Sequence, residues 1–93
     1  MYDLIPSAFY LSQNYPNPFK DKTTIKYCVA YETKVKITVF NSNGEMIKTL
    51  VDEEKEAGTY EIEIDGSGLA TGTYHYLLEV GDYRSKKKML LIK

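Results

Sequence analysis

Apolar side chains recur at every second position in several short stretches of this chain, and this alternation restricts the fold more than any other feature. Between Tyr74 and Val80, one set of alternate positions carries two tyrosines, a leucine and a valine, and the pair Gly81-Asp82 follows. A period of two places one set of side chains on each face of a β-strand. A Gly-Asp pair suits a two-residue hairpin turn, because glycine adopts positive φ without strain. Residues 72–93 are therefore predicted to form a β-hairpin whose second strand covers 83–93.

The same alternation, broken by turn-forming residues, predicts most of the remaining strands. The expected strands cover residues 9–13, 23–29, 34–40, 46–51 and 59–65. Residues 52–57 are acidic around Lys55 and are expected to form a loop or a short helical turn, whereas 66–72 is expected to be a long turn in which Leu69 closes the end of the core. About seven short strands with regular turn signals and no convincing helix predict an all-β, immunoglobulin-like antiparallel β-sandwich. The Cys…Trp…Cys pattern of antibody domains is absent, so the similarity is one of architecture.

The segment from Asn14 to Phe19 interrupts this pattern with two prolines, Pro16 and Pro18. Each proline fixes its own φ and restricts the residue before it to extended conformations. The segment is therefore excluded from a helix and from a central strand. Tyr15 and Phe19 flank the prolines, and both are expected to pin this rigid loop to the core.

The length and charge of the chain limit its class. A chain of 93 residues makes one domain, in which residues 1–8 are expected to be the remnant of a linker and 9–93 the folded unit. A net charge of −1 argues against nucleic-acid binding, which needs a basic face. No apolar run approaches the ~20 residues of a membrane-spanning helix, and the first residues lack the features of a secretory signal peptide. The single cysteine, Cys28, forms no internal disulfide and is expected to be an apolar strand residue.

Catalytic and metal-binding constellations are not recognisable in the sequence, and no enzymatic activity, metal or cofactor is expected. The single histidine, His75, is expected on the outward face of a strand, and no local partner activates it or Cys28 as a nucleophilic pair requires. No spacing of acidic residues matches a calcium loop, and no glycine-rich run opens a helix to hold phosphate. Glu61 and Glu63 alternate along one strand, which is typical of a solvent-exposed face.

Two features remain, the proline segment and the lysine-rich strand at the end of the sequence. Together with further motifs in the same order, they resemble the C-terminal sorting domain, type A, of the type IX secretion system of Bacteroidetes and related bacteria. The resemblance covers residues 9–93. The motifs that carry it are Leu11–Phe19, Thr23–Tyr27, Val39-Phe40-Asn41 with Gly44, Ile47–Val51, Gly58–Glu61, Gly68–Tyr74 and Lys87–Lys93.

The resemblance implies a β-sandwich that serves as an address label for a larger cargo protein on its N-terminal side. In that family, the secretion machinery, including outer-membrane shuttle and translocon components, recognises the domain in the periplasm. The cargo crosses the outer membrane and is secreted or held at the cell surface, and a sortase-like peptidase usually removes the domain. Any cleavage site is expected in residues 2–8 or upstream of them.

Carried onto this sequence, the resemblance assigns partner recognition to the proline segment, a Gly-x-Tyr element and the terminal strand. The residues concerned are Pro16, Asn17, Pro18, Phe19, Gly72, Tyr74, Lys86, Lys87, Lys88, Leu90, Ile92 and Lys93. A physical argument points the same way, because a terminal edge strand can pair with a partner sheet through its backbone. A row of lysines adds electrostatic steering.

Two other functions are compatible with the sequence. A non-catalytic binding module for carbohydrate or protein at the cell surface would use exposed aromatic rings, for which Tyr10, Tyr31 and Tyr83 are the candidates, and a coplanar exposed row would favour it. A structural immunoglobulin-like module of an appendage such as the flagellar hook cap has similar strand motifs and would lie inside a longer chain. An exposed terminal strand also allows a strand-exchanged homodimer.

Overall fold

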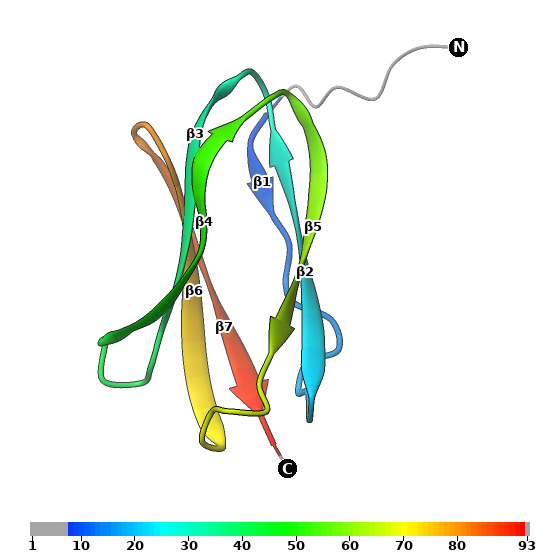
Figure 1. The fold of residues 1–93 in the computed structure, drawn as a ribbon, viewed down its shortest axis with the longest axis vertical. Coiled ribbons are helices and arrows are strands. Elements are labelled where there is room, and N and C mark those ends of the chain that lie inside the picture. Colours follow the sequence, from blue (N-terminus) through cyan, green and yellow to red (C-terminus); the bar gives the residue numbers. More distant parts are fainter. Residues whose placement is uncertain (1–7, 93) are drawn as a thin grey trace.

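The structure, a computed structural model, describes residues 8–92 and arranges them as two antiparallel β-sheets packed face to face (Figure 1). The strands are β1 (Tyr10–Leu11), β2 (Lys22–Val29), β3 (Thr33–Phe40), β4 (Met46–Lys55), β5 (Gly58–Asp65), β6 (Gly72–Val80) and β7 (Tyr83–Leu91). One sheet has the order β1-β2-β5 and the other the order β4-β3-β6-β7, and residues 8–92 contain no helix. The predicted all-β sandwich of about seven strands is confirmed.

The core lies between the two sheets and follows the alternation in the sequence. At least every second side chain of β2, β3 and β6 is buried, because it faces the opposite sheet. The largest fully buried side chains are Leu11, Phe19, Ile25, Tyr27, Ile37, Tyr76, Leu78, Met89 and Leu91. Leu69 packs against this core from the turn between β5 and β6, as the sequence predicted.

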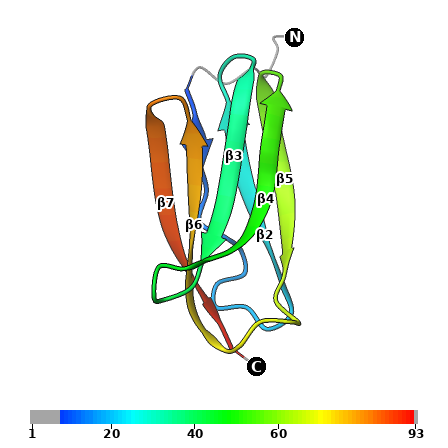
Figure 2. The same cartoon turned by 60° about the vertical axis from the view of Figure 1, so that its left-hand side comes forward.

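Each narrow side of the sandwich is formed by one edge strand from each sheet. β4 and β5 lie along one side, and β1 and β7 lie along the other (Figure 2). β1 has only two residues, so most of this second side is completed by the segment that follows it. β1 begins near one end of the sandwich, and β7 finishes at the opposite end (Figure 1).

The hairpin predicted at the end of the sequence is present. β6 and β7 pair without a register shift, from Gly72 opposite Leu91 to Val80 opposite Tyr83. Gly81 begins the two-residue turn at a φ of 57°, the positive value for which glycine was expected. β7 ends at Leu91, and the predicted end of the strand at 93 lies outside the described residues.

Two predicted boundaries were wrong. β4 continues through residues 52–55, which are strand and not a loop or a helical turn. This stretch pairs with the start of β3, where Lys34 and Asp52 form an ion pair at 3.5 Å. Because β4 is an edge strand, this end of it is solvated and carries charges instead of the apolar alternation that signals a strand. The first strand is shorter than the expected 9–13, because the chain from Ser12 onward bonds β2 only at isolated points.

Gly66 offers a test of how tightly the end of the core is packed. A Cβ atom at this position would lie 2.9 Å from Phe19 Cε2 and 3.1 Å from Leu91 Cδ1, whereas a Cβ atom at Gly68 would meet no atom within 4 Å. Gly66→Ala is therefore expected to lower the free energy of unfolding by about 1–3 kcal/mol through overpacking. Gly68→Ala, the matched control, is expected to change it by less than about 0.5 kcal/mol. Urea denaturation of both variants measures the difference, and equal stabilities would show that Phe19 and Leu91 yield without cost.

Candidate functional site

The proline segment lies against the end of β7, so the two features singled out in the sequence form one surface. We refer to residues 13–19 as the strap. The Phe19 N–H donates to the Leu90 carbonyl at 3.0 Å, and the Ile92 N–H donates to the Phe19 carbonyl at 2.8 Å. These two bonds form a parallel β-bridge between Phe19 and Leu91. The strap therefore acts as a short additional strand beside β7.

Side chains of the strap complete this contact. The Leu90 N–H donates to Asn17 Oδ1 at 3.0 Å, and Gln13 Nε2 donates to the Lys88 carbonyl at 2.6 Å. Each bond satisfies a backbone group of β7 that points away from β6. The strap thus covers the outer edge of β7 over residues 88–92.

The strap is fixed at the same time to β2 in the other sheet. Tyr15 and Thr24 exchange two backbone hydrogen bonds, at 2.9 and 3.0 Å. The buried Asn14 amide donates to Thr23 Oγ1 at 3.0 Å and to the Pro16 carbonyl at 3.1 Å, and the Thr23 hydroxyl donates to the same carbonyl at 2.8 Å. The strap therefore joins the two sheets along the side of the sandwich that β1 and β7 form.

The two aromatic side chains of the strap take opposite positions. Phe19 is 1% exposed and belongs to the core, as predicted, whereas Tyr15 is 81% exposed, so its predicted role as a second anchor is wrong. The reason is its pairing with Thr24. Residues directly opposite in a β-bridge project to the same face, and Thr24 lies on the outer face of β2 between the buried residues 23 and 25. Residues 16–18 of the strap are exposed.

β7 divides its predicted recognition residues between two faces. The exposed outer set is Arg84, Lys86, Lys88, Leu90 and Ile92. Lys87 lies on the other face, half-buried, in line with the buried Met89 and Leu91. The three neighbouring lysines therefore do not form one group, and two of them, at 86 and 88, face outward beside two exposed apolar side chains. Lys93 lies outside the described residues.

The Gly-x-Tyr element lies in β6, next to the end of β7. Gly72 is opposite Leu91 in the hairpin. Tyr74 is buried, and its hydroxyl donates to the Ala70 carbonyl in the preceding turn. Tyr74 thus supports the turn and the core, and its side chain is not presented at the surface.

A groove of about 350 Å³ runs between the strap and the outer face of the β6–β7 hairpin. Its walls are Asn17, Pro18, Thr73, Lys88, Met89 and Leu90. Four of these residues, at 17, 18, 88 and 90, were candidates from the sequence, and the fold brings them together from positions about 70 apart. Ligand sites have volumes of about 300–1,000 Å³, so this groove suits a side chain of a partner better than a large cofactor.

The lysines beside this groove carry positive charge that is not neutralised within residues 8–92. None of Lys86, Lys87 and Lys88 forms an ion pair with a described carboxylate. Arg84, by contrast, pairs with Glu79 on β6 at 3.1 Å. The end of the hairpin that carries the groove is therefore the more positive one.

β7 leaves only part of its outer edge open. Alternate residues bond β6, so the backbone groups of residues 84, 86, 88, 90 and 92 point the other way. The strap uses most of those at 88–92, whereas those of Arg84 and Lys86 receive no hydrogen bond from the described part of the chain. The predicted availability of the terminal strand for pairing is thus restricted to its first half.

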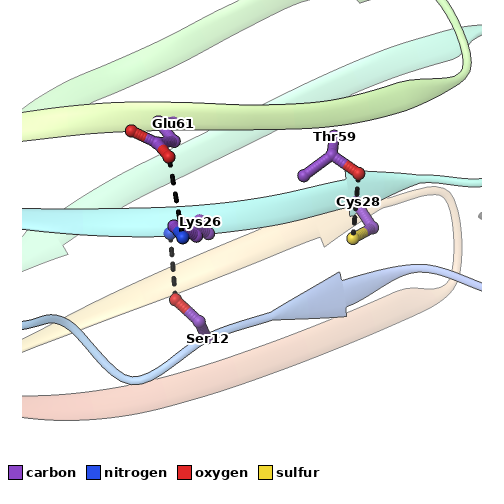
Figure 3. Close-up of polar contacts among 5 residues, drawn as sticks. All are labelled: Ser12, Lys26, Cys28, Thr59 and Glu61. Carbon is purple, nitrogen blue, oxygen red and sulfur yellow. Dashed lines mark hydrogen bonds and ion pairs between the residues drawn. The ribbon is translucent and has the colours of Figure 1, made fainter. Parts of the chain in front are cut away.

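The structure separates the residues considered for catalysis. Cys28 lies on the outer face of β2, with its sulfur 3.7 Å from the Thr59 hydroxyl of β5 (Figure 3). His75 lies on β6, in the other sheet. Over residues 8–92, no group of three or more His, Cys, Asp or Glu side chains could hold a metal ion, and no helix is long and apolar enough to cross a membrane.

The candidate tyrosines do not form a coplanar row. Tyr31 and Tyr83 both contact Phe9, with ring centroids 5.1 and 5.8 Å away and interplanar angles of 79° and 36°. Tyr10 is in β1, opposite Cys28, and is exposed apart from this group. This arrangement disfavours a flat aromatic platform for sugar rings.

Tyr76 links the chain just before the strap to the core, and its ionisation makes the stability of the domain depend on pH. Its buried hydroxyl donates to the Ser12 carbonyl at 2.7 Å, and burial raises the pKa of Tyr76 to about 12. Unfolded tyrosine loses its proton near pH 10, so the folded state retains a proton that the unfolded state releases. The contribution of Tyr76 to the free energy of unfolding is therefore constant below about pH 10 and falls by roughly 2–3 kcal/mol as the pH rises to about 12.

Tyr76→Phe is expected to remove the part of the fall in the free energy of unfolding between about pH 10 and 12 that is due to Tyr76. The comparison is urea unfolding of the two proteins between about pH 9 and pH 12. Burial also raises the pKa of Tyr27, so a smaller slope remains in the variant. Parallel curves for the two proteins would contradict the assignment to Tyr76.

Comparison with known proteins identifies the family and supports the fold. The family model described as "Secretion system C-terminal sorting domain" matches residues 13–93. A similar solved structure is that of PorZ, an essential bacterial surface component of the type-IX secretion system of Porphyromonas gingivalis, with 18% sequence identity and a TM-score of 0.61. The match covers 91% of this chain but only 11% of that one, so it supports the shared fold. No curated protein gave a significant match. The chain belongs to the family of C-terminal sorting domains that serve as signals for type IX secretion.

Proposed function

We propose that this domain directs an N-terminal cargo across the outer membrane to the cell surface, and that the groove between the strap and β7 is the surface that the secretion machinery recognises. The proposal rests on one observation: four hydrogen bonds join the strap to β7. Recognition in this view requires the folded domain, because neither element has this shape by itself.

The chemistry of the surface supports a protein partner with acidic character. Lys86 and Lys88 project from the outer face of β7 and form no ion pair with a described carboxylate, and Leu90 adds an exposed apolar side chain beside the groove. Carboxylates on the partner would steer association toward this side. An apolar side chain of the partner would enter the groove between Asn17 and Leu90.

A sortase-like peptidase is proposed to cut at the other end of the domain. β1 begins near one end of the sandwich and the groove lies near the other, where β7 finishes (Figure 1). The principal axis of the molecule measures 43 Å. The shuttle and the peptidase could therefore contact the domain at the same time.

A secretion assay with a matched control tests the recognition surface. Residues 1–93 are fused behind a periplasmic reporter in a bacterium with this secretion system. The variant Lys86→Glu/Lys88→Glu is compared with the control Lys36→Glu/Lys48→Glu. All four lysines are exposed and form no ion pair in the described chain. The first variant is expected to reduce surface reporter to roughly a tenth or less, because attraction to an acidic partner becomes repulsion. The control is expected to be exported normally.

Thermal unfolding of both purified domains must accompany the assay. Most exposed substitutions change stability by less than about 0.5 kcal/mol. Lys36→Glu in the control also places a carboxylate opposite Asp52 and Glu79, at a cost of about 0.2–1 kcal/mol for each pair. Both variants are still expected to fold. If the folded Lys86→Glu/Lys88→Glu domain is exported as well as the control, the proposed surface is wrong.

A further inference from the structure

The outer edge of β5 is an open strand edge on the side of the sandwich away from the strap. On β2, the backbone groups of residues 24 and 26 bond the chain that precedes it, so those of residues 23, 25, 27 and 29 bond β5. By the same register, the N–H and C=O groups of Thr59, Glu61 and Glu63 point away from β2. β5 is the last strand of its sheet, and no strand of the described chain lies beyond it.

β5 differs from the two other long edges in having neither a cover nor an irregularity. The strap covers half of β7. β4 has two register shifts against β3, which disrupt its edge. β5 pairs with β2 over eight residues without a shift. Proteins usually block a regular exposed edge, so an unblocked one is suited to receive a strand.

Negative charge beside the β5 edge favours pairing with a positively charged strand. Residues 45–65, which include β4 and β5, contain eight acidic and two basic side chains, although the whole chain has a net charge of only −1. Glu61 and Glu63 lie on the outer face of β5, loosely paired with Lys26 and Lys22 at 3.7 and 3.8 Å, and all four side chains are more than half exposed. Figure 3 shows Glu61 turned toward Lys26 across the sheet.

The same charges act against pairing of β5 with a second copy of itself. An antiparallel β5–β5 pair centred on Glu61 would place the two Glu61 side chains directly opposite each other, and Thr59 opposite Glu63. Like charges directly opposite are destabilising, whereas opposite charges stabilise a strand pair. In this register the edge disfavours its own sequence, whereas a strand with cations at alternate positions would be attracted to it.

The inner side of the edge requires apolar residues at the other alternate positions. A groove of about 190 Å³ lies between β4 and β5, and Leu50, Ile64 and Leu69 contribute to its largely apolar lining. Tyr60 and Ile62 on the inner face of β5 are only partly buried. Inward side chains of an added strand would pack on these residues and close the groove.

We infer that the outer edge of β5 is a docking site for an extended segment of a partner protein in which Lys or Arg alternates with apolar side chains. The segment would add a fourth strand to the β1-β2-β5 sheet, with cations near Glu61 and Glu63 and apolar side chains over the β4–β5 groove. This inference is independent of the proposed sorting surface, because β5 and β7 lie on opposite sides of the sandwich (Figure 2).

The probe is the peptide acetyl-KVKVKVK-amide, and its acidic counterpart acetyl-EVEVEVE-amide is the control ligand. Each is titrated into the ¹⁵N-labelled domain and followed by amide chemical shifts and hydrogen exchange. The basic peptide is expected to shift the amides of Thr59, Glu61 and Glu63 saturably and to slow their exchange. The acidic peptide is expected to leave them unchanged.

Three variants separate the contribution of the two glutamate charges to peptide binding from that of the backbone edge. Glu61→Lys/Glu63→Lys is expected to weaken binding of the basic peptide about tenfold or more, because two attractive cross-strand pairs become repulsive. Glu32→Lys/Asp82→Lys makes the same change of charge at exposed turn residues outside β5 and is expected to retain binding. Thr59→Pro removes one outward N–H while both glutamates remain, and it is expected to weaken binding through the backbone.

The inference fails if no saturable shift occurs at β5, if the shifts centre on β7, or if Glu61→Lys/Glu63→Lys binds as well as the starting protein. It also fails if the free domain sediments as a dimer with the β5 amides already protected, since a second copy would then occupy the edge. Thermal unfolding of each variant confirms that lost binding does not reflect lost folding.

Discussion

Replacing Phe19 by alanine is expected to lower the free energy of unfolding by about 3–5 kcal/mol, the range for truncating a buried phenylalanine. The side chain is fully buried, and its ring lies beside Gly66 and Leu91, where the strap meets β7. The substitution leaves a cavity at the end of the core and removes the one strap side chain that anchors there. Urea denaturation of the purified domain measures the loss.

Tyr15→Ala is the matched control for this prediction. Tyr15 is an aromatic residue of the same strap, but its side chain is 81% exposed. Its removal is expected to change the free energy of unfolding by less than about 0.5 kcal/mol. If Phe19→Ala cost no more than Tyr15→Ala, the strap would not be held by its buried ring and its hydrogen bonds alone would have to account for its position.

A chain that stops after Arg84 is expected not to fold. It lacks the fully buried Met89 and Leu91, and each such side chain contributes about 2–5 kcal/mol against a total stability of only about 5–15 kcal/mol for a domain. It also lacks the partners of the strap. The dispersion of amide signals in an NMR spectrum distinguishes a folded from an unfolded product.

A chain that stops after Leu91 provides the comparison. It retains both buried side chains and loses the hydrogen bond from the Ile92 N–H to the Phe19 carbonyl, at a cost of about 1 kcal/mol. It is therefore expected to fold. A well-dispersed spectrum for the chain that stops after Arg84 would contradict the role of the last strand in the core. Secretion of a reporter is informative only for the variant that folds, because an unfolded label fails regardless of its recognition residues.

The sequence was sufficient to predict the strands that have one buried face. In β2, β3 and β6, alternation of apolar side chains is a direct consequence of one face lying against the opposite sheet. At residues 52–55 this signal disappears, because the end of an edge strand is solvated and its side chains are free to be charged. Backbone pairing with β3 determines the structure there, and no local pattern in the sequence records it.

The candidate site was predicted as two separate parts and not as one surface. The prolines interrupt the alternation, so the sequence could not indicate which of Tyr15 and Phe19 faces inward. Nor could it indicate that Asn17 bonds the backbone of Leu90, since the amide of an asparagine can reach many groups. The division of the lysines was readable, because counting back by two from the apolar Met89 places Lys87 on the inner face.

The strap and β7 also make the proposed recognition surface depend on residues that are far apart in the chain. Their hydrogen bonds join residues 73 and 75 positions apart in the chain. During synthesis or export that proceeds from the N-terminus, the strap can pair with β2 early, but its contacts with β7 form only after almost the last of these residues has emerged. A protein that has lost β7, through early termination or proteolysis, then carries its cargo without the complete surface that we propose for recognition.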